Sequence, residues 1–208
     1  MTQSPLFILL LFGGALYLAK IWYEDLRANA GAEPHPRALP GAFPAPRLAL
    51  LIAAAGALFL VLVETGGEIA LGVSGEQSDI TVLFLLAMVG AGIIEEVLFR
   101  GYLVVEGKGR AWLIGSILLF SLLFSLAHYQ YYVEVPEEGS WTEFSFKTDA
   151  KSAWSLLLLF LNSLWFYAVR FLPFNPRHSL LPCFVAHISS NLGVFIVKAA
   201  QGHVTSLF

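Results

Sequence analysis

Residues Thr81–Val105 read TVLFLLAMVGAGIIEEVLFRGYLVV, an apolar run interrupted by two adjacent carboxylates and one arginine. A run of about 18 or more mostly apolar residues is long enough to cross a bilayer as a helix. Charged side chains are costly at that depth, and they mark a functional or buried polar site. The stretch therefore predicts a membrane helix on which Glu95, Glu96 and Arg100 belong to such a site.

The rest of the chain has the same character. Of its 208 residues, 57% are hydrophobic and 13% are charged, whereas soluble domains carry roughly 45–50% apolar and about 25% charged residues. We predict an all-α fold, a polytopic transmembrane helix bundle of about six spans that forms a single membrane domain over residues 1–208. Besides Thr81–Val105, the predicted spans are Pro5–Ile21, Leu48–Val63, Ala111–Tyr129, Ala153–Phe171 and Leu180–Ala200.

Polar segments separate the predicted spans. Residues 27–47 hold five prolines among alanines and glycines, which is the composition of an irregular linker. The loops 64–80 and 131–151 are acidic, and their sequence assigns them no function. The net charge of −3 gives no basis for a nucleic-acid partner.

Lysine and arginine are distributed unequally between the two ends of the predicted bundle. Nine lie in or beside the first, third and fifth loops: Lys20, Arg27, Arg37, Arg47, Arg100, Lys108, Arg110, Arg170 and Arg177. Lys147, Lys151 and Lys198 lie at the other end. Basic loops stay in the cytoplasm. We therefore expect an integral protein of a prokaryotic plasma membrane with both termini outside the cytoplasm.

Three further polar residues lie within predicted spans, namely His128, His187 and Asn191. Residues four apart share one face of a helix. This spacing lets His187 and Asn191 point at one place in the bundle, and it lets the Phe124 ring pack beneath the imidazole of His128.

The same rule applies to the first site described above. Glu96 and Arg100 are four residues apart and are expected to pair. Glu95 lies about 100° around the helix from Glu96, so we expect the two carboxylates to have different partners.

Depth in the membrane tests whether these residues can meet. At a rise of about 1.5 Å per residue from the basic ends, Glu95, His187 and Asn191 lie roughly 10–16 Å deep. On the same scale His128 lies roughly 25 Å deep. Glu95, His187 and Asn191 therefore lie at similar depths, in the half of the membrane nearer the cytoplasm. His128 joins them only if the fourth helix is tilted or begins further into the cytoplasm.

A carboxylate, two imidazoles and a carboxamide are the groups that water activation and oxyanion stabilisation require. The alternative is a buried polar cluster that joins helices through hydrogen bonds. Other proteolytic motifs do not fit. H-E-x-x-H is absent, no aspartate occurs within a predicted span, and GVSG at Gly72–Gly75 lies in a polar loop.

Three motifs together resemble those of a known family. Glu95–Arg100 matches EExxxR, Phe124–His128 matches FxxxH, and His187–Asn191 matches HxxxN. Their order resembles that of the CPBP family (CAAX protease and bacteriocin-processing, also called ABI), which includes the eukaryotic type II CAAX prenyl endopeptidase. The resemblance covers residues 81–200.

The resemblance implies a glutamate-dependent intramembrane endopeptidase. In it, Glu95 and His128 activate a water, and His187 and Asn191 stabilise the oxyanion. Glu96, Arg100 and Phe124 match the motifs in supporting roles. The implied partners are the lipid bilayer and a membrane-embedded, lipidated or C-terminal peptide substrate.

Two other functions use the same residues. A non-enzymatic protein could bind a membrane peptide or confer immunity with this polar cluster, and a transporter could relay protons through Glu and His. No cofactor is expected. Zinc is chemically possible for Glu95, His128 and His187, but the set lacks the helical histidine pair of H-E-x-x-H sites.

Overall fold

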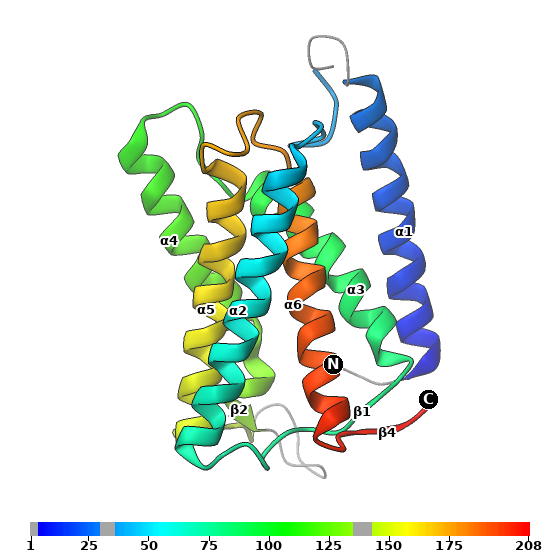
Figure 1. Cartoon of the computed structure of the whole chain (residues 1–208), viewed down its shortest axis with the longest axis vertical. Helices are drawn as coiled ribbons and strands as arrows, with labels where there is room; N and C mark the ends of the chain where they lie inside the picture. The colour runs from blue at the N-terminus through cyan, green and yellow to red at the C-terminus, as the bar shows by residue number, and fades with distance from the viewer. Residues whose placement is uncertain (1–3, 30–35, 135–142) are drawn as a thin grey trace.

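The computed structural model describes residues 4–29, 36–134 and 143–208. Six helices form a bundle (Figure 1), with the bounds α1 (Pro5–Ala28), α2 (Arg47–Leu71), α3 (Phe84–Glu95), α4 (Arg110–Ala127), α5 (Ala150–Phe171) and α6 (Leu181–Ala200). All except α3 are long and apolar enough to cross a membrane. Large apolar side chains such as Leu6, Leu51 and Leu62 face outward, each more than 60% exposed. The predicted all-α polytopic bundle is confirmed.

The third predicted span is divided into two kinds of helix. After α3, the chain continues without a break as a π-helix, η1 (Glu96–Tyr102). The amide of Leu103 donates to the carbonyl of Leu98, five residues back, at 2.9 Å. The Tyr167 hydroxyl on α5 lies 2.9 Å from the carbonyl oxygen of Phe99 and 2.8 Å from that of Leu103. A neighbouring helix thus supplies a donor where the wider turn alters the backbone pairing.

Two predicted bounds are too short. α1 continues to Ala28, and α2 continues to Leu71, so that Thr65–Leu71 is helical although it was predicted as loop. Glu68 in this last part of α2 is 3% exposed, and it pairs with Lys151 and accepts from Gln77. Its charge is balanced inside the bundle, which lets the helix continue past the apolar run.

The linker 27–47 is irregular but attached to the bundle. Its described part has neither helix nor strand between Asn29 and Arg47, and residues 30–35 lie outside the described residues. Trp22 donates to the Pro40 carbonyl at 3.2 Å, and Leu180 donates to the Gly41 carbonyl at 2.9 Å. The φ of Gly41 is +62°, and an added Cβ there would lie 2.6 Å from Leu180. Glycine permits this close approach.

Close helix packing brings the site-bearing helices together. α6 contacts α2, α3 and α5, and α1 packs on α3. A Cβ at Gly90 of α3 would lie 3.3 Å from the backbone of Phe12, which supports the expectation that the Gly90–Gly92 run allows close approach. On α2, Gly56 lies against the Trp165 indole, whose nitrogen donates to the Ala53 carbonyl at 3.1 Å.

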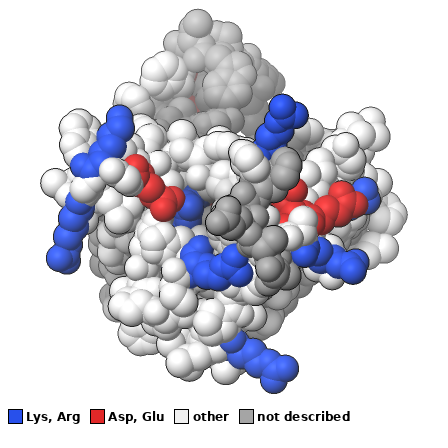
Figure 2. All heavy atoms as spheres, turned by 90° about the horizontal axis from the view of Figure 1, so that it is seen from above, with Lys and Arg blue, Asp and Glu red and all other residues white. Residues whose placement is uncertain are grey.

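The two ends of the bundle differ in charge. The α1–α2, α3–α4 and α5–α6 connections meet at one end, the upper end in Figure 1. Basic side chains are spread over this face (Figure 2). The opposite end carries β1 (Ile80–Thr81) paired with β4 (Val204–Ser206), β2 (Val133–Glu134) paired with β3 (Ser145–Phe146), and the single turn η2 (Tyr129–Tyr131). We call these the basic end and the strand end.

Candidate active site

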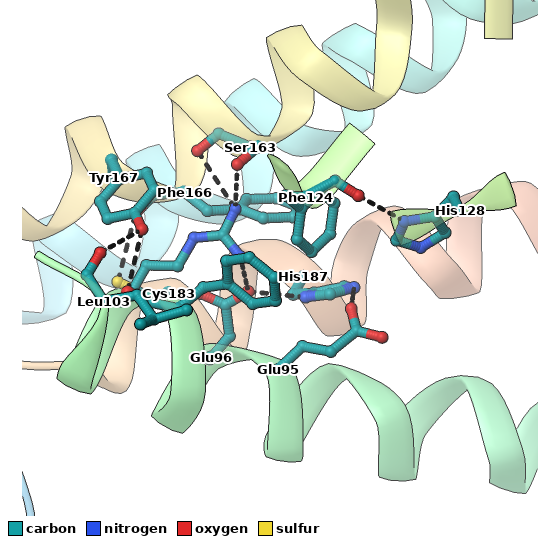
Figure 3. Close-up of polar contacts among 12 residues, drawn as sticks. Glu95, Glu96, Leu103, Phe124, His128, Ser163, Phe166, Tyr167, Cys183 and His187 are labelled. Carbon is teal, nitrogen blue, oxygen red and sulfur yellow. Dashed lines mark hydrogen bonds and ion pairs between the residues drawn. The ribbon is translucent and has the colours of Figure 1, made fainter. Parts of the chain in front are cut away.

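The buried core of the site is centred on Glu96. Its Oε1 accepts from Arg100 Nη1 at 3.1 Å and from His187 Nδ1 at 2.7 Å (Figure 3). The side chains of Glu96 and Arg100 are 0% exposed, and that of His187 is 7% exposed. The predicted Glu96–Arg100 pair is confirmed. It extends to a third group on α6, which helical spacing within one span cannot predict.

Arg100 is held by α5 as well as by Glu96. Its Nη2 donates to the Ser163 Oγ at 2.7 Å and to the Ser163 carbonyl at 3.2 Å. The guanidinium carbon lies 4.6 Å, 5.0 Å and 4.9 Å from the ring centres of Phe124, Phe166 and Tyr167. Such ring faces stabilise a cation that is removed from water.

The sequence analysis missed the three residues that α5 contributes, Ser163, Phe166 and Tyr167. One signal was available. Asn162 and Ser163 are adjacent polar residues in an otherwise apolar span, and both are buried. Intramembrane polar side chains usually face a bundle interior.

Glu95 differs from Glu96 by facing open space. Its side chain is 21% exposed, and its Oε2 lies 3.8 Å from His187 Nε2. That separation is too long for a hydrogen bond and suits a contact through an intervening atom. The expectation of different partners for the two carboxylates is therefore wrong, because both face His187, at opposite ring nitrogens. The cause is the position of α6, which places His187 against both residues.

Aromatic rings fix the orientation of His187. The Phe166 ring stacks on it with centres 4.7 Å apart and 21° between the planes, and the Phe124 ring meets it at 6.0 Å. With Nδ1 donating to Glu96, Nε2 is also a donor only when the ring carries both protons. The charges of Glu95, Glu96, Arg100 and His187 then sum to zero.

His128 lies beside Glu95 and His187, not between them (Figure 3). α4 ends at Ala127, and the His128 ring packs on Phe124 with centres 4.8 Å apart, as the FxxxH spacing predicted. Its Nδ1 is 2.8 Å from the Phe124 carbonyl oxygen. A carbonyl only accepts, so Nδ1 carries the hydrogen. In the neutral ring, Nε2 is then the proton acceptor.

Asn191 and His187 pack closely on α3 because Gly92 has no side chain. A Cβ at Gly92 would lie 3.4 Å from the His187 ring and 3.6 Å from Asn191 Nδ2. The same Nδ2 donates to the Met88 carbonyl at 2.8 Å. That bond fixes the carboxamide against α3 and uses one of its two hydrogens. His187 and Asn191 thus meet the same part of α3, as their spacing predicted.

A cavity of about 580 Å³ joins the four predicted catalytic residues. Glu95, His128, His187 and Asn191 all line it, whereas Glu96, Arg100 and Phe124 do not. It also reaches Lys198, eleven residues after His187, and it therefore runs about 16 Å along α6. Residues at different depths line one space, and His128 is one of them.

The cavity reaches the surface at the strand end. Its other lining residues include Glu76, Ser78, Gln130, Lys147 and Asp149, all exposed. The depth count, which started from the basic end, expected a site nearer that end. The lining instead continues to the opposite end, and neither Glu96 nor Arg100 is part of it.

The donor set for zinc does not converge. Among the described residues, no group of three His, Cys, Asp or Glu side chains is arranged to hold a metal ion. Glu95 and His187 face each other, while the ring of His128 is directed to Phe124. Whether the reaction needs a metal stays a prediction.

Comparison with known proteins gives one match. A family model described as type II CAAX prenyl endopeptidase Rce1-like matches residues 77–193, more than half of the chain. The match contains all three motifs. No curated protein and no solved structure matches the chain.

Proposed function

The chain belongs to the type II CAAX prenyl endopeptidase Rce1-like family and is a membrane-embedded protease, and from this premise we propose that it cleaves peptides with a water activated by Glu95. One observation carries the proposal. Of the two motif glutamates, Glu95 is the one that lines the cavity, with its Oε2 3.8 Å from His187 Nε2. A water beside the two groups can hydrogen-bond to both of them at that separation.

The reaction begins with this water. Glu95 takes one proton from the water while the water oxygen attacks the carbonyl carbon of the peptide bond. His128 Nε2, the free acceptor of a ring that also lines the cavity, assists in holding the water. Glu95 then returns the proton to the departing nitrogen, and the C–N bond breaks. The second proton of the water stays on the new carboxyl group, so the products are a carboxylic acid and an amine.

His187 and Asn191 stabilise the tetrahedral oxyanion. His187 donates from Nε2 and Asn191 from its second amide hydrogen, because their other donors are bound to Glu96 and Met88. Glu96 and Arg100 position His187 and do not touch the substrate. No metal takes part in this scheme, since His187 and Asn191 stabilise the oxyanion by hydrogen bonds.

The substrate is a membrane-associated or C-terminal peptide. A 580 Å³ space accommodates several residues of an extended chain, and its apolar walls Ile80, Phe84 and Val194 suit hydrophobic side chains. A lipid attached to the peptide would remain beside the outward-facing apolar helices.

We also propose that both termini face away from the cytoplasm. Arg100, Arg170 and Lys198 are buried and do not count as loop charges, which leaves seven basic residues against two (9 − 2 = 7 and 3 − 1 = 2). The cavity would then open on the non-cytoplasmic side. A reporter fused after Phe208 should read as non-cytoplasmic. A cytoplasmic reading would reverse the orientation and place the cavity mouth in the cytoplasm.

Peptide cleavage tests the function directly. Purified wild-type protein and Glu95→Gln are incubated with an unbiased peptide library, and the products are identified by mass spectrometry. We expect wild type alone to yield products with one preferred cleavage position. A wild-type protein that binds library peptides but cuts none would favour the non-enzymatic peptide-binding alternative.

A further inference from the structure

A lysine continues the catalytic face of α6. His187, Asn191, Val194 and Lys198 all line the cavity, at intervals of four, three and four residues. These intervals keep side chains on one face of a helix. Lys198 is therefore the residue at which this face reaches the strand end.

Lys198 is a buried cation with little compensation. It is 8% exposed, and its Nζ donates to the Ser78 carbonyl at 2.7 Å, with the Ser78 Oγ at 3.5 Å. Among the described residues, no carboxylate oxygen is paired with it within 4.0 Å. A buried ammonium that forms no ion pair is costly.

Two of the carboxylates near this lysine have other partners. Glu68 pairs with Lys151, and Asp79 pairs with His203 at 2.9 Å. Glu64 on α2 borders the same region but forms no ion pair with Lys198. An ammonium has three donors, and in the described part of the chain the hydrogen bonds of Lys198 go to Ser78. The remaining donors are available to a ligand in the cavity.

We propose that Lys198 binds the terminal carboxylate of the peptide substrate. The inference rests on the proposed function, because the same peptide must reach Glu95. Along α6, Lys198 is about 10.5 Å from Asn191 and about 16.5 Å from His187, at 1.5 Å per residue. An extended peptide covers about 3.3–3.6 Å per residue. The cleaved bond then lies roughly three to five residues before the chain end.

Lys147 provides a matched comparison. It lines the same cavity with the same charge, but it is exposed at the mouth. Solvent screens an exposed charge much more than a buried one. A general attraction of the cavity for anions would involve both lysines, whereas a carboxylate site involves Lys198 alone.

The test measures binding, so that it does not depend on turnover. A mixed hydrophobic peptide library is synthesised twice, with free carboxylates and with C-terminal amides, and is bound to Glu95→Gln protein in detergent. The bound peptides are quantified by mass spectrometry. We expect the free acids to bind roughly 10- to 100-fold more tightly than the amides. Adding Lys198→Gln, which keeps a donor for Ser78, should remove that preference, and adding Lys198→Arg or Lys147→Met should keep it.

The two proposals fail in different ways. Equal binding of acids and amides to the Glu95→Gln protein overturns the carboxylate site, as does loss of the preference in Lys147→Met to the same degree. The comparison of acids with amides uses the Glu95→Gln protein alone, so it does not require a lysine variant to fold. If the preference holds and the wild-type protein cuts nothing, the carboxylate site stands and the protease mechanism does not.

Discussion

Glu95 and Glu96 are adjacent and chemically identical, yet they occupy opposite environments. Glu96 is 0% exposed and accepts from Arg100 and His187 at 3.1 and 2.7 Å. Glu95 is 21% exposed, lines the cavity, and faces His187 across 3.8 Å. Glu96 is buried and holds two donors on its Oε1, whereas Glu95 has room for a reactant.

The difference separates a carboxylate that positions His187 from one that is proposed to react with the substrate water. Glu96 and Arg100 fix the His187 ring from behind, with the aromatic rings of α4 and α5 around them. Glu96 is not accessible to a reactant, because its side chain is 0% exposed and does not line the cavity. Glu95 has no donor at hydrogen-bond distance among the described residues. The comparison yields four predictions, taken here from the largest expected effect to the smallest.

The largest effect is expected at Glu95. Glu95→Gln should lower the rate of peptide cleavage by about 10²–10⁴-fold, the usual contribution of a general base, with the unfolding temperature unchanged. Glu76→Gln is the matched control, since Glu76 lines the same cavity but is exposed at its mouth. A Glu95→Gln protein that is folded and cleaves at the wild-type rate would remove Glu95 as the base.

Glu96→Gln should act on stability. It leaves the Arg100 guanidinium buried without its carboxylate, at a cost of about 3–5 kcal/mol in the free energy of unfolding. Chemical unfolding in detergent measures the loss. Glu24→Gln is the control, because Glu24 forms a pair of the same spacing with Lys20 at 3.0 Å, and an exposed pair contributes little to stability. Equal losses in the two variants would contradict the supporting role.

Ser163→Ala should weaken the same cluster more mildly. It removes the Oγ that accepts from Arg100 at 2.7 Å, while the Ser163 carbonyl still accepts at 3.2 Å. We expect a loss of about 1–3 kcal/mol. Ser121→Ala serves as control, because the Ser121 Oγ is buried with no hydrogen-bond partner in the described structure. That variant should be neutral or more stable, and the opposite order would refute the assignment.

The smallest expected effect is that of metal removal. Protein treated with a chelator, and shown by elemental analysis to lack zinc, should cleave its peptide at an unchanged rate. The reason is that His187 and Asn191 act as hydrogen-bond donors in the proposed scheme. Activity that is lost on chelation and returns with one zinc per chain would replace this mechanism and keep the protease.

Contacts within one helix could be predicted from the sequence. The Glu96–Arg100 pair, the Phe124–His128 ring contact and the shared face of His187 and Asn191 all follow from a spacing of four residues. The spans followed from apolar length, with errors at their ends. The error in α2 arose because Glu68 is neutralised by Lys151, a residue 83 positions away.

Contacts between helices were decided by the tertiary structure. Periodicity specifies which residues share a face, but not how far one helix slides or turns against another. The packing of α3, α5 and α6 therefore determined that Glu96 meets His187, that Ser163 meets Arg100, and that Lys198 ends the cavity. The sequence by itself determined a membrane bundle carrying three motifs. Only the packed structure decided that Glu96 positions His187 and that Glu95 faces the cavity. The reason is that burial and partner distance depend on all the helices together.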